Sequence, residues 1–402
     1  MPSPEWQLKW KRFRSQKRAF WSLLILVLLT LAVLPAELLC NSKPLVVRWQ
    51  NRWFFPTFKT YTYQDFGGKR NTEPDYHSAK FRRLVGLQPP EEQAAVEQDV
   101  ADILADFDLD IAPAPDTAPP VEEAPPRPPA DPAFLLWPPV PYDYAYIFTG
   151  TRETRSALIA PWETTAEGTG ESIDRGWGER HFLGTDDRGR DVLARLVYGL
   201  RVSLVFGFLL ALAGTVVGAV VGAIQGYFAG WIDLLGQRAV EIWGSLPQLY
   251  LLMILSSLLV RSIFVLFFIL LLTSWMGMSA YMRAEFLRGR NLDYVRAARS
   301  LGVSNTAIMF RHILPNSLTP IITFLPFSIS GGILALVSLD FLGLGVPSPY
   351  PSLGELLSQG HRNLHAVWIS IPTFLVLSAT ITLLTFIGDG FRNAFDPRRA
   401  KS

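Results

Sequence analysis

Cysteine is almost absent from this chain, since Cys40 is the only one among 402 residues. A disulfide framework or a thiolate metal cluster needs several cysteines, so both are excluded. The five histidines show no metal-ligand spacing. No GxxxxGK[ST] phosphate loop occurs either, so we expect any ATP hydrolysis to take place in another protein. We therefore predict no catalytic residues, no metal site and no bound cofactor.

Charge is also scarce. Only 18% of the residues are charged, whereas 49% are apolar. This composition excludes a disordered polypeptide, because such chains are rich in charge and poor in apolar residues. The 37 Lys and Arg nearly balance the 35 Asp and Glu, which gives no indication of a nucleic-acid partner. The apolar residues fall in long runs, which argues against a simple soluble globule.

These long runs predict membrane-spanning helices, which need roughly 20 mostly apolar residues each. Six stretches contain no Asp, Glu, Lys or Arg: 19–36, 202–232, 242–260, 262–282, 312–339 and 363–388. We predict an all-α polytopic membrane protein with six transmembrane helices. The first is assigned to 20–40, and the other five form a core over 201–388.

The distribution of Lys and Arg predicts which side of the membrane each segment faces. Basic residues gather before the first span, between the fourth and fifth spans, and after the sixth. Because positive loops remain in the cytoplasm, we predict a cytoplasmic N-terminus (1–19), a cytoplasmic loop (283–315) and a cytoplasmic tail (389–402). A lipoprotein signal cleaved before Cys40 is the alternative for the first span. The run is long for a signal, and Leu39 is large for a cleavage site, so an uncleaved anchor is favoured.

The region between the first two spans would then face outward, and it divides into three parts. Residues 41–87 are rich in aromatics and predict a small β-like module with turns at Asn51-Arg52 and Gly67-Gly68. Residues 88–141 are rich in Pro and acids, which is typical of an extended linker. A spacer is favoured there over a docking segment. Residues 142–200 end in an amphipathic helix.

The chain that enters the second span carries several charges. We expect Thr185 or Asp186 to cap its helix and Asp191 to pair with Arg195 four residues later. Two interpretations remain open: a helix lying at the membrane interface, and a helix packed on the outer module.

Within the spans, one feature predicts close helix packing. Gly214, Gly218, Gly222 and Gly226 recur every four residues and lie on one helix face. Their neighbour is either another subunit or a helix of this same chain. The few charged residues near spans, Glu241, Asp340 and Asp389, lie at span ends, where we expect them to be solvated or locally paired. The membrane midplane contains no paired carboxylates, which argues against a proton-driven carrier.

The loop between the fourth and fifth spans predicts two short helices. The first covers 292–301, Gly302 suits a left-handed position after it, and Ser304 or Asn305 caps the second. Small and basic side chains lie together in the first helix, at Arg296, Ala297, Ala298 and Arg299. Such a loop is either a knob for a partner protein or an amphipathic loop on lipid headgroups.

The pattern Ala297-Ala298, Gly302 and Ile313-Leu314-Pro315 resembles the EAA loop of ATP-binding-cassette importer permeases. Stretches 181–204 and 283–315, together with the later Ser338–Gly345 and Pro351–Glu355, resemble the C-type permeases of dipeptide and oligopeptide importers. The aromatic module after the first span, with Asp65-Phe66-Gly67-Gly68, is similar to the Yej-type permease of microcin C and peptide import. Arg296 stands where the EAA loop has a Glu.

This resemblance implies a permease subunit in the inner membrane of a bacterium. It implies four kinds of partner besides the lipid bilayer: a second homologous permease, cytoplasmic ATPase subunits, a periplasmic peptide-binding protein and a peptide substrate. The loop 292–315 would couple to the ATPase through Arg296, Ala297, Ala298, Arg299, Gly302, Leu314 and Pro315. The alternatives are an ion-driven secondary carrier and a membrane-anchored receptor.

Overall fold

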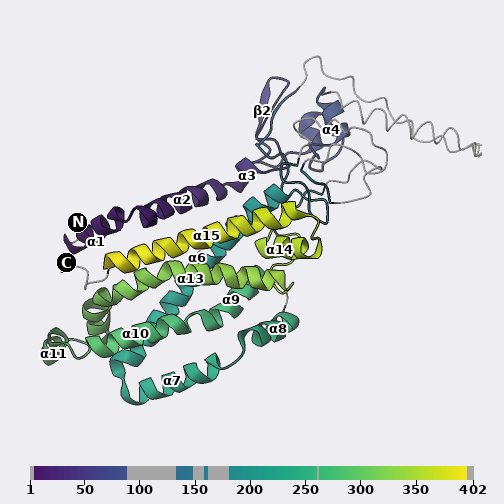
Figure 1. Ribbon diagram of the computed structural model, residues 1–402. Coiled ribbons are helices and arrows are strands. Elements are labelled where there is room, and N and C mark those ends of the chain that lie inside the picture. Colours follow the sequence, from purple (N-terminus) through teal and green to yellow (C-terminus); the bar gives the residue numbers. More distant parts are fainter. Residues whose placement is uncertain (1–3, 88–132, 148–157, 162–180, 260–261, 396–402) are drawn as a thin grey trace, which may run out of the picture. The chain divides into compact units, whose positions relative to one another are not determined.

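The computed structural model describes residues 4–87, 133–147, 158–161, 181–259 and 262–395 (Figure 1). The chain divides into two compact units. The helical unit comprises residues 1–36, 147–176 and 180–402, and the sheet unit comprises 37–146 and 177–179.

The helical unit contains the long apolar helices. Its principal helices are α1 (Pro4–Ser15), α2 (Lys17–Val33), α6 (Val192–Phe228), α7 (Gly230–Gly244), α8 (Gln248–Leu258), α9 (Ile263–Ser274), α10 (Met276–Gly289), α11 (Asp293–Ser300), α12 (Asn305–Ala307), α13 (Leu318–Phe341), α14 (Leu353–Arg362) and α15 (Val367–Phe395). The π-helix η3 (Ile308–Ile313) and the 3-10 helix η4 (Leu314–Ser317) join α12 to α13. Helix α6 is central, because it contacts α10, α13, α14 and α2.

Four helical stretches among the described residues are long and apolar enough to cross a membrane, and α1 with α2 adds a fifth if this bent pair counts as one span. The predicted span 242–260 is not one helix. Helix α7 ends at Gly244, and α8 begins after Pro247, its N-cap. Proline lacks the backbone N–H that a continuous helix needs, which accounts for the break.

The predicted second span also ends earlier than expected. Helix α6 stops at Phe228, and the chain then turns through Ala229 and Gly230, with φ of 53° and 57°. Left-handed backbone is accessible to glycine at little cost, so the turn forms beside Gly230. Helix α7 starts there, and the Asp233 carboxylate accepts two hydrogen bonds from Arg283 of α10, at 2.5 and 2.7 Å.

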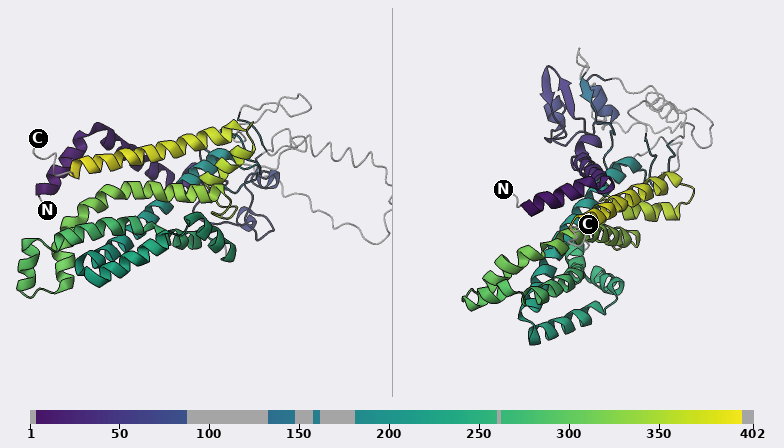
Figure 2. Two further views of the ribbon diagram at one scale, coloured as in Figure 1. Left: turned by 60° about the horizontal axis from the view of Figure 1, so that its bottom comes forward. Right: turned by 60° about the vertical axis from the view of Figure 1, so that its left-hand side comes forward.

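The helical unit has two distinct ends. In Figure 1 and in the left view of Figure 2, α11 lies at the same end as the N and C labels, and α14 lies at the opposite end. The Phe13 ring stacks on Phe391 with 4.7 Å between ring centroids, which joins α1 to α15. Helix α1, the loop with α11 and the last turns of α15 therefore lie at one end. We call this end the loop end and the other the α14 end.

The sheet unit contains a three-stranded antiparallel sheet of order β2-β1-β3. Its strands are β1 (Val46–Trp49), β2 (Arg52–Phe54) and β3 (Phe134–Leu136), with α3 (Ala36–Leu39), the 3-10 helix η1 (Tyr63–Phe66) and α4 (Ala79–Leu84) around them. The β1–β2 turn lies at Gln50 and Asn51, both left-handed, one residue before the predicted turn. Gly67 has φ of 78°, as its predicted turn requires.

Strand β3 corrects the predicted end of the Pro-rich linker at residue 141. Val46 pairs with Leu136, and Arg48 pairs with Phe134, so the chain has returned to the sheet by residue 134. The flanking sequence is rich in proline and acids, so composition gives no indication of a strand of only three residues. Its partner strand also lies far away in the chain. The rest of the predicted linker, 88–132, lies outside the described residues.

Candidate functional site

The loop end carries the segment that the sequence singles out, and its predicted backbone is confirmed. Helix α11 ends at Ser300, and Gly302 follows with φ of 78°. The Ser304 hydroxyl accepts a hydrogen bond from the Ala307 amide at 3.4 Å and caps α12. The predicted second helix differs in one respect, because residues 308–313 form a π-helix, a local widening often found at functional sites.

One side of α11 faces solvent and the other faces the helical unit. Arg296 and Ala297 are exposed, and Leu301 is 83% exposed, a large value for an apolar side chain. Ala298 is only 8% exposed and packs in the core. Ala297 and Ala298 therefore face opposite surroundings, because neighbouring helix positions point in different directions.

The buried side of the loop forms an apolar seat. Val295, Ile308 and Ile313 are almost fully buried and join a cluster with Met282 and Phe286 of α10. A Cβ on Gly289 would lie 2.9 Å from the Ile313 side chain, so that glycine lets the loop approach α10 closely. The loop is thus packed as one body with α10.

Tyr227, at the end of α6, adds a polar contact that sequence reasoning misses. Its hydroxyl donates to the Asn305 side-chain oxygen at 2.7 Å, and its ring lies 5.5 Å below the Arg299 guanidinium. Nothing in the linear pattern distinguishes Tyr227 from an ordinary interfacial aromatic. Of the remaining predicted residues, Leu314 is half-buried and Pro315 exposed, both at the joint between the loop and α13.

The four glycines of α6 face other helices of this same chain: Gly214 faces the last residue of α9, and the other three face α10 and Trp275 just before it. A Cβ on Gly214 would lie 2.8 Å from Ser274, and one on Gly226 would lie 2.5 Å from the Arg283 carbonyl oxygen. A Cβ on Gly218 would overlap the carbonyl oxygen of Trp275, and a Cβ on Gly222 would overlap that of Ser279. The sequence left open whether these glycines pack against another subunit or against a helix of the same chain. In the structure they pack against helices of the same chain.

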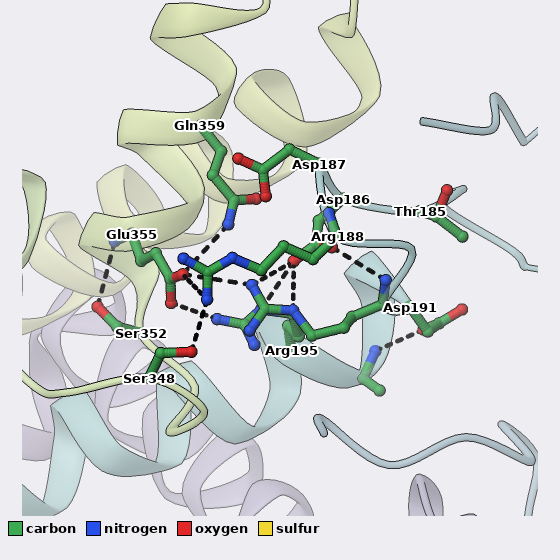
Figure 3. Close-up of polar contacts among 12 residues, drawn as sticks. Thr185, Asp186, Asp187, Arg188, Asp191, Arg195, Ser348, Ser352, Glu355 and Gln359 are labelled. Carbon is green, nitrogen blue, oxygen red and sulfur yellow. Dashed lines mark hydrogen bonds and ion pairs between the residues drawn. The ribbon is translucent and has the colours of Figure 1, made fainter. Parts of the chain in front are cut away.

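The α14 end contains a buried cluster of ion pairs (Figure 3). Asp186 accepts a hydrogen bond from Arg190 Nε at 2.8 Å, and Arg195 Nε lies 3.4 Å from the same carboxylate. Arg195 Nη2 donates to Glu355 of α14 at 2.5 Å, and Arg190 Nη2 donates to it at 3.2 Å. Two carboxylates and two guanidiniums therefore connect the start of α6 to α14.

The predicted cap and pair in this segment are wrong. Asp191, rather than Thr185 or Asp186, caps the helix by accepting from the Ala194 amide at 2.7 Å, and its other oxygen lies 2.9 Å from His181 Nδ1. Arg195 pairs across to α14 instead of with Asp191. Sequence spacing favours local pairs, but burial of Arg195 at 0% exposure requires more than one partner.

Two more carboxylates complete this end. Asp340 accepts from the Val346 amide at 2.7 Å and from the Ser352 hydroxyl, so it is locally paired, as its position at a span end predicts. Burial and the neighbouring Asp186 raise the pKa of Asp187, which lies 3.7 Å from Arg362. Within the described residues, no three His, Cys, Asp or Glu side chains gather as a metal site requires.

Two segments of the chain match known protein families. Residues 204–401 match the family model of the binding-protein-dependent transport system inner membrane component, and residues 5–74 match that of the N-terminal TM domain of oligopeptide transport permease C.

Two relatives cover nearly the whole chain. The peptidoglycan transport system permease protein YejE of Agrobacterium fabrum is 38% identical over 99% of this chain and 94% of its own length. The inner membrane ABC transporter permease protein YejE of Escherichia coli is 38% identical over 99% and 98%. The oligopeptide transport system permease protein OppC of Haemophilus influenzae is 36% identical over 54% and 70%. The chain therefore belongs to the family of inner membrane permease components of binding-protein-dependent ABC transport systems.

Proposed function

We propose that this chain forms half of the translocation path of an ATP-driven peptide importer. Its relatives carry names for peptidoglycan and oligopeptide transport, which supports a peptide cargo, including peptidoglycan-derived or microcin C-like peptides. The observation that carries the proposal is the loop at the loop end, with an exposed Leu301 on one side and an apolar seat on the other.

In this proposal an ATPase subunit binds the exposed side of α11, at Ala297 and Leu301, and the exposed Phe310 beside it. Protein interiors are close-packed and transmit displacement. Because Val295 and Ile308 are packed against α10, motion of the ATPase would move α10 with the loop. Helix α6 would follow, since its glycines allow backbone contact with α10. The path would then switch between inward- and outward-facing states.

We further propose six membrane crossings in the inner membrane of a bacterium, with both termini in the cytoplasm. Helices α7 and α8 together would supply the sixth crossing, as a span broken before Pro247. The sheet unit would face outward. The partners would be a second homologous permease, a separate cytoplasmic ATPase and an extracytoplasmic peptide-binding protein.

Cysteine labelling tests the loop as the ATPase contact. Single cysteines replace Ala297 and Leu301 in a Cys40→Ala background, and Leu364, an exposed residue at the α14 end, serves as the control. We expect the assembled ATPase to protect positions 297 and 301 from a water-soluble maleimide and to leave 364 reactive. Equal labelling with and without the ATPase would refute the contact.

Transport by a loop variant tests the function itself. Leu301→Asp should cut ATP-dependent peptide uptake by reconstituted complexes about 30-fold, because it places a charge at an apolar contact worth about 2 kcal/mol. Leu364→Asp makes the same change at the other end and should transport normally. Uptake that survives ATP depletion and collapses with the ion gradient would instead indicate a secondary carrier.

A further inference from the structure

One face of the sheet unit is apolar and exposed. Strand register places Arg48 opposite both Trp53 and Phe134, and Val46 opposite Leu136. Because side chains alternate between the two faces of a strand, these five residues share one side of the sheet, which we call the outer sheet face. Trp53 and Phe134 are each 57% exposed, and Leu136 is also exposed.

The opposite side of the same sheet is already occupied. Val47, Trp49 and Phe54 are buried in a core with Phe66 and Phe81. The sheet therefore packs on the core through one face only. The exposed residues of the other face make no contribution to that core. Contiguous exposed apolar patches of this kind mark interaction sites.

Further exposed apolar side chains lie close to β1 and β2 in the chain, and none lies elsewhere in the described part of the unit apart from β3. Phe55 and Phe58 follow β2, and Phe58 is 74% exposed; Leu38 of α3 is exposed as well. Among the described residues of the sheet unit, every exposed large apolar side chain falls in residues 37–58 or in β3.

Basic side chains accompany these aromatics. On the outer sheet face, the Arg48 guanidinium lies 5.5 Å from the Trp53 ring centroid. Lys59 follows the exposed Phe58 in the chain and lies 5.5 Å from the ring centroid of Tyr61, which packs against the core. Residues 41–60 contain four Lys and Arg and no Asp or Glu, and of these Lys43 is paired with Glu73. Exposed Trp and Phe beside Lys and Arg match the chemistry of a phospholipid headgroup layer, where aromatic rings and cations are both stabilised.

The chain also joins this unit to an apolar helix by a short connection. Apolar helix α2 ends at Val33, and α3 begins at Ala36, so only Leu34 and Pro35 separate them. Two residues span at most about 7 Å, and the sheet unit begins at Glu37. A surface tethered this near a membrane anchor is presented to lipid at high effective concentration.

We infer that the outer sheet face, together with Phe58 and Lys59 that follow β2 in the chain, docks on an anionic phospholipid surface and orients the sheet unit on the membrane. The docking is independent of which side of the membrane the unit occupies and of the peptide-import function. Burial of the aromatic rings supplies the apolar term, and Arg48 and Lys59 supply attraction to lipid phosphate, which salt weakens.

The test uses the full chain without partner subunits, in nanodiscs of neutral lipid with 30% phosphatidylglycerol. Single cysteines at Trp53 and Phe58, in a Cys40→Ala background, carry a fluorophore that nitroxide-labelled lipid quenches on contact. Asn71 is the matched control, since it is exposed in the same unit but outside the apolar region. We expect quenching at 53 and 58 to exceed that at 71 about threefold, and Arg48→Glu with Lys59→Glu to remove most of the difference.

Three results would overturn the inference. Equal quenching at all three positions would mean that the outer sheet face has no preferential contact with lipid. Shielding of position 58 from an aqueous quencher in the nanodisc, without quenching by the nitroxide lipid, would mean that the chain covers this face itself. If lipid quenching at position 58 disappears when the binding protein of the system is added, this face is a contact for that protein and not for lipid. Position 58 keeps the test valid if Trp53→Cys fails to fold, because Phe58 is the most exposed of these rings.

Discussion

Different interactions stabilise the two ends of the helical unit. At the loop end, α11 and η3 rest on α10 through apolar side chains, with Tyr227 as a polar contact to Asn305. At the α14 end, Arg190 and Arg195 connect the start of α6 to Glu355 of α14 through buried ion pairs. Helix α6 runs from one end to the other (Figure 1).

This difference indicates which end can move. Val295, Ile308 and Ile313 pack closely with Met282 and Phe286 of α10, so the loop and α10 can move together as one body and keep the contacts between them. Charge-assisted hydrogen bonds are directional, and Arg–carboxylate pairs fix both distance and orientation. We therefore expect the α14 end to hold a fixed register while the loop end receives and transmits displacement.

Loss of one buried guanidinium should have the largest effect. Arg195→Met leaves the Asp186 and Glu355 carboxylates with one partner fewer, and breaking such a pair costs about 3–5 kcal/mol. Thermal unfolding of the full chain in detergent measures the loss. Arg188→Met is the matched control, because Arg188 lies at the rim of the cluster with half its side chain exposed and should contribute less than about 1 kcal/mol. If both variants lose the same free energy of unfolding, the buried ion pairs contribute no more to stability than the exposed Arg188.

The second-largest loss of stability should come from a cavity among the buried apolar residues beneath the loop. Ile308→Ala removes a fully buried side chain from the loop end, which costs about 2–5 kcal/mol depending on how far the site collapses. Phe310→Ala, two residues later and exposed, should stay within about 0.5 kcal/mol of the parent chain. The same unfolding measurement checks both. A neutral Ile308→Ala would mean that the seat is not packed, and the loop could not move α10.

The smallest expected effect is a pH dependence confined to the α14 end. The raised pKa of Asp187 means that the folded chain binds its proton more tightly than the unfolded chain. Stability from this group is therefore lost as pH rises above about 3.8. Asp187→Asn does not titrate, so its melting temperature relative to the parent should be higher at pH 7 than at pH 4. Ile308→Ala should show no such change with pH, and an equal shift in both variants would contradict the assignment.

Local rules account for much of the loop. Gly302 after an eight-residue helix and Ser304 three residues before Ala307 are readable from sequence, because capping depends on neighbours in the chain. The same rule also holds for the cap by Asp191, which accepts from Ala194 three residues later, but no local rule covers the second contact of Asp191 or the pairing of Arg195. There the partners are His181, ten residues away, and Glu355, 160 residues away, and no local spacing records such distances.

The sequence by itself determined the apolar helices, the segregation of basic residues into three segments, and the glycine face of α6, because hydropathy, charge and helical periodicity are properties of short stretches of chain. Tertiary structure decided that this glycine face packs on α10, that Ala298 is buried while Ala297 is exposed, and that β3 returns to the sheet after the acidic segment. These outcomes depend on which distant surface each residue meets, and burial is settled by the whole packed assembly of helices and strands.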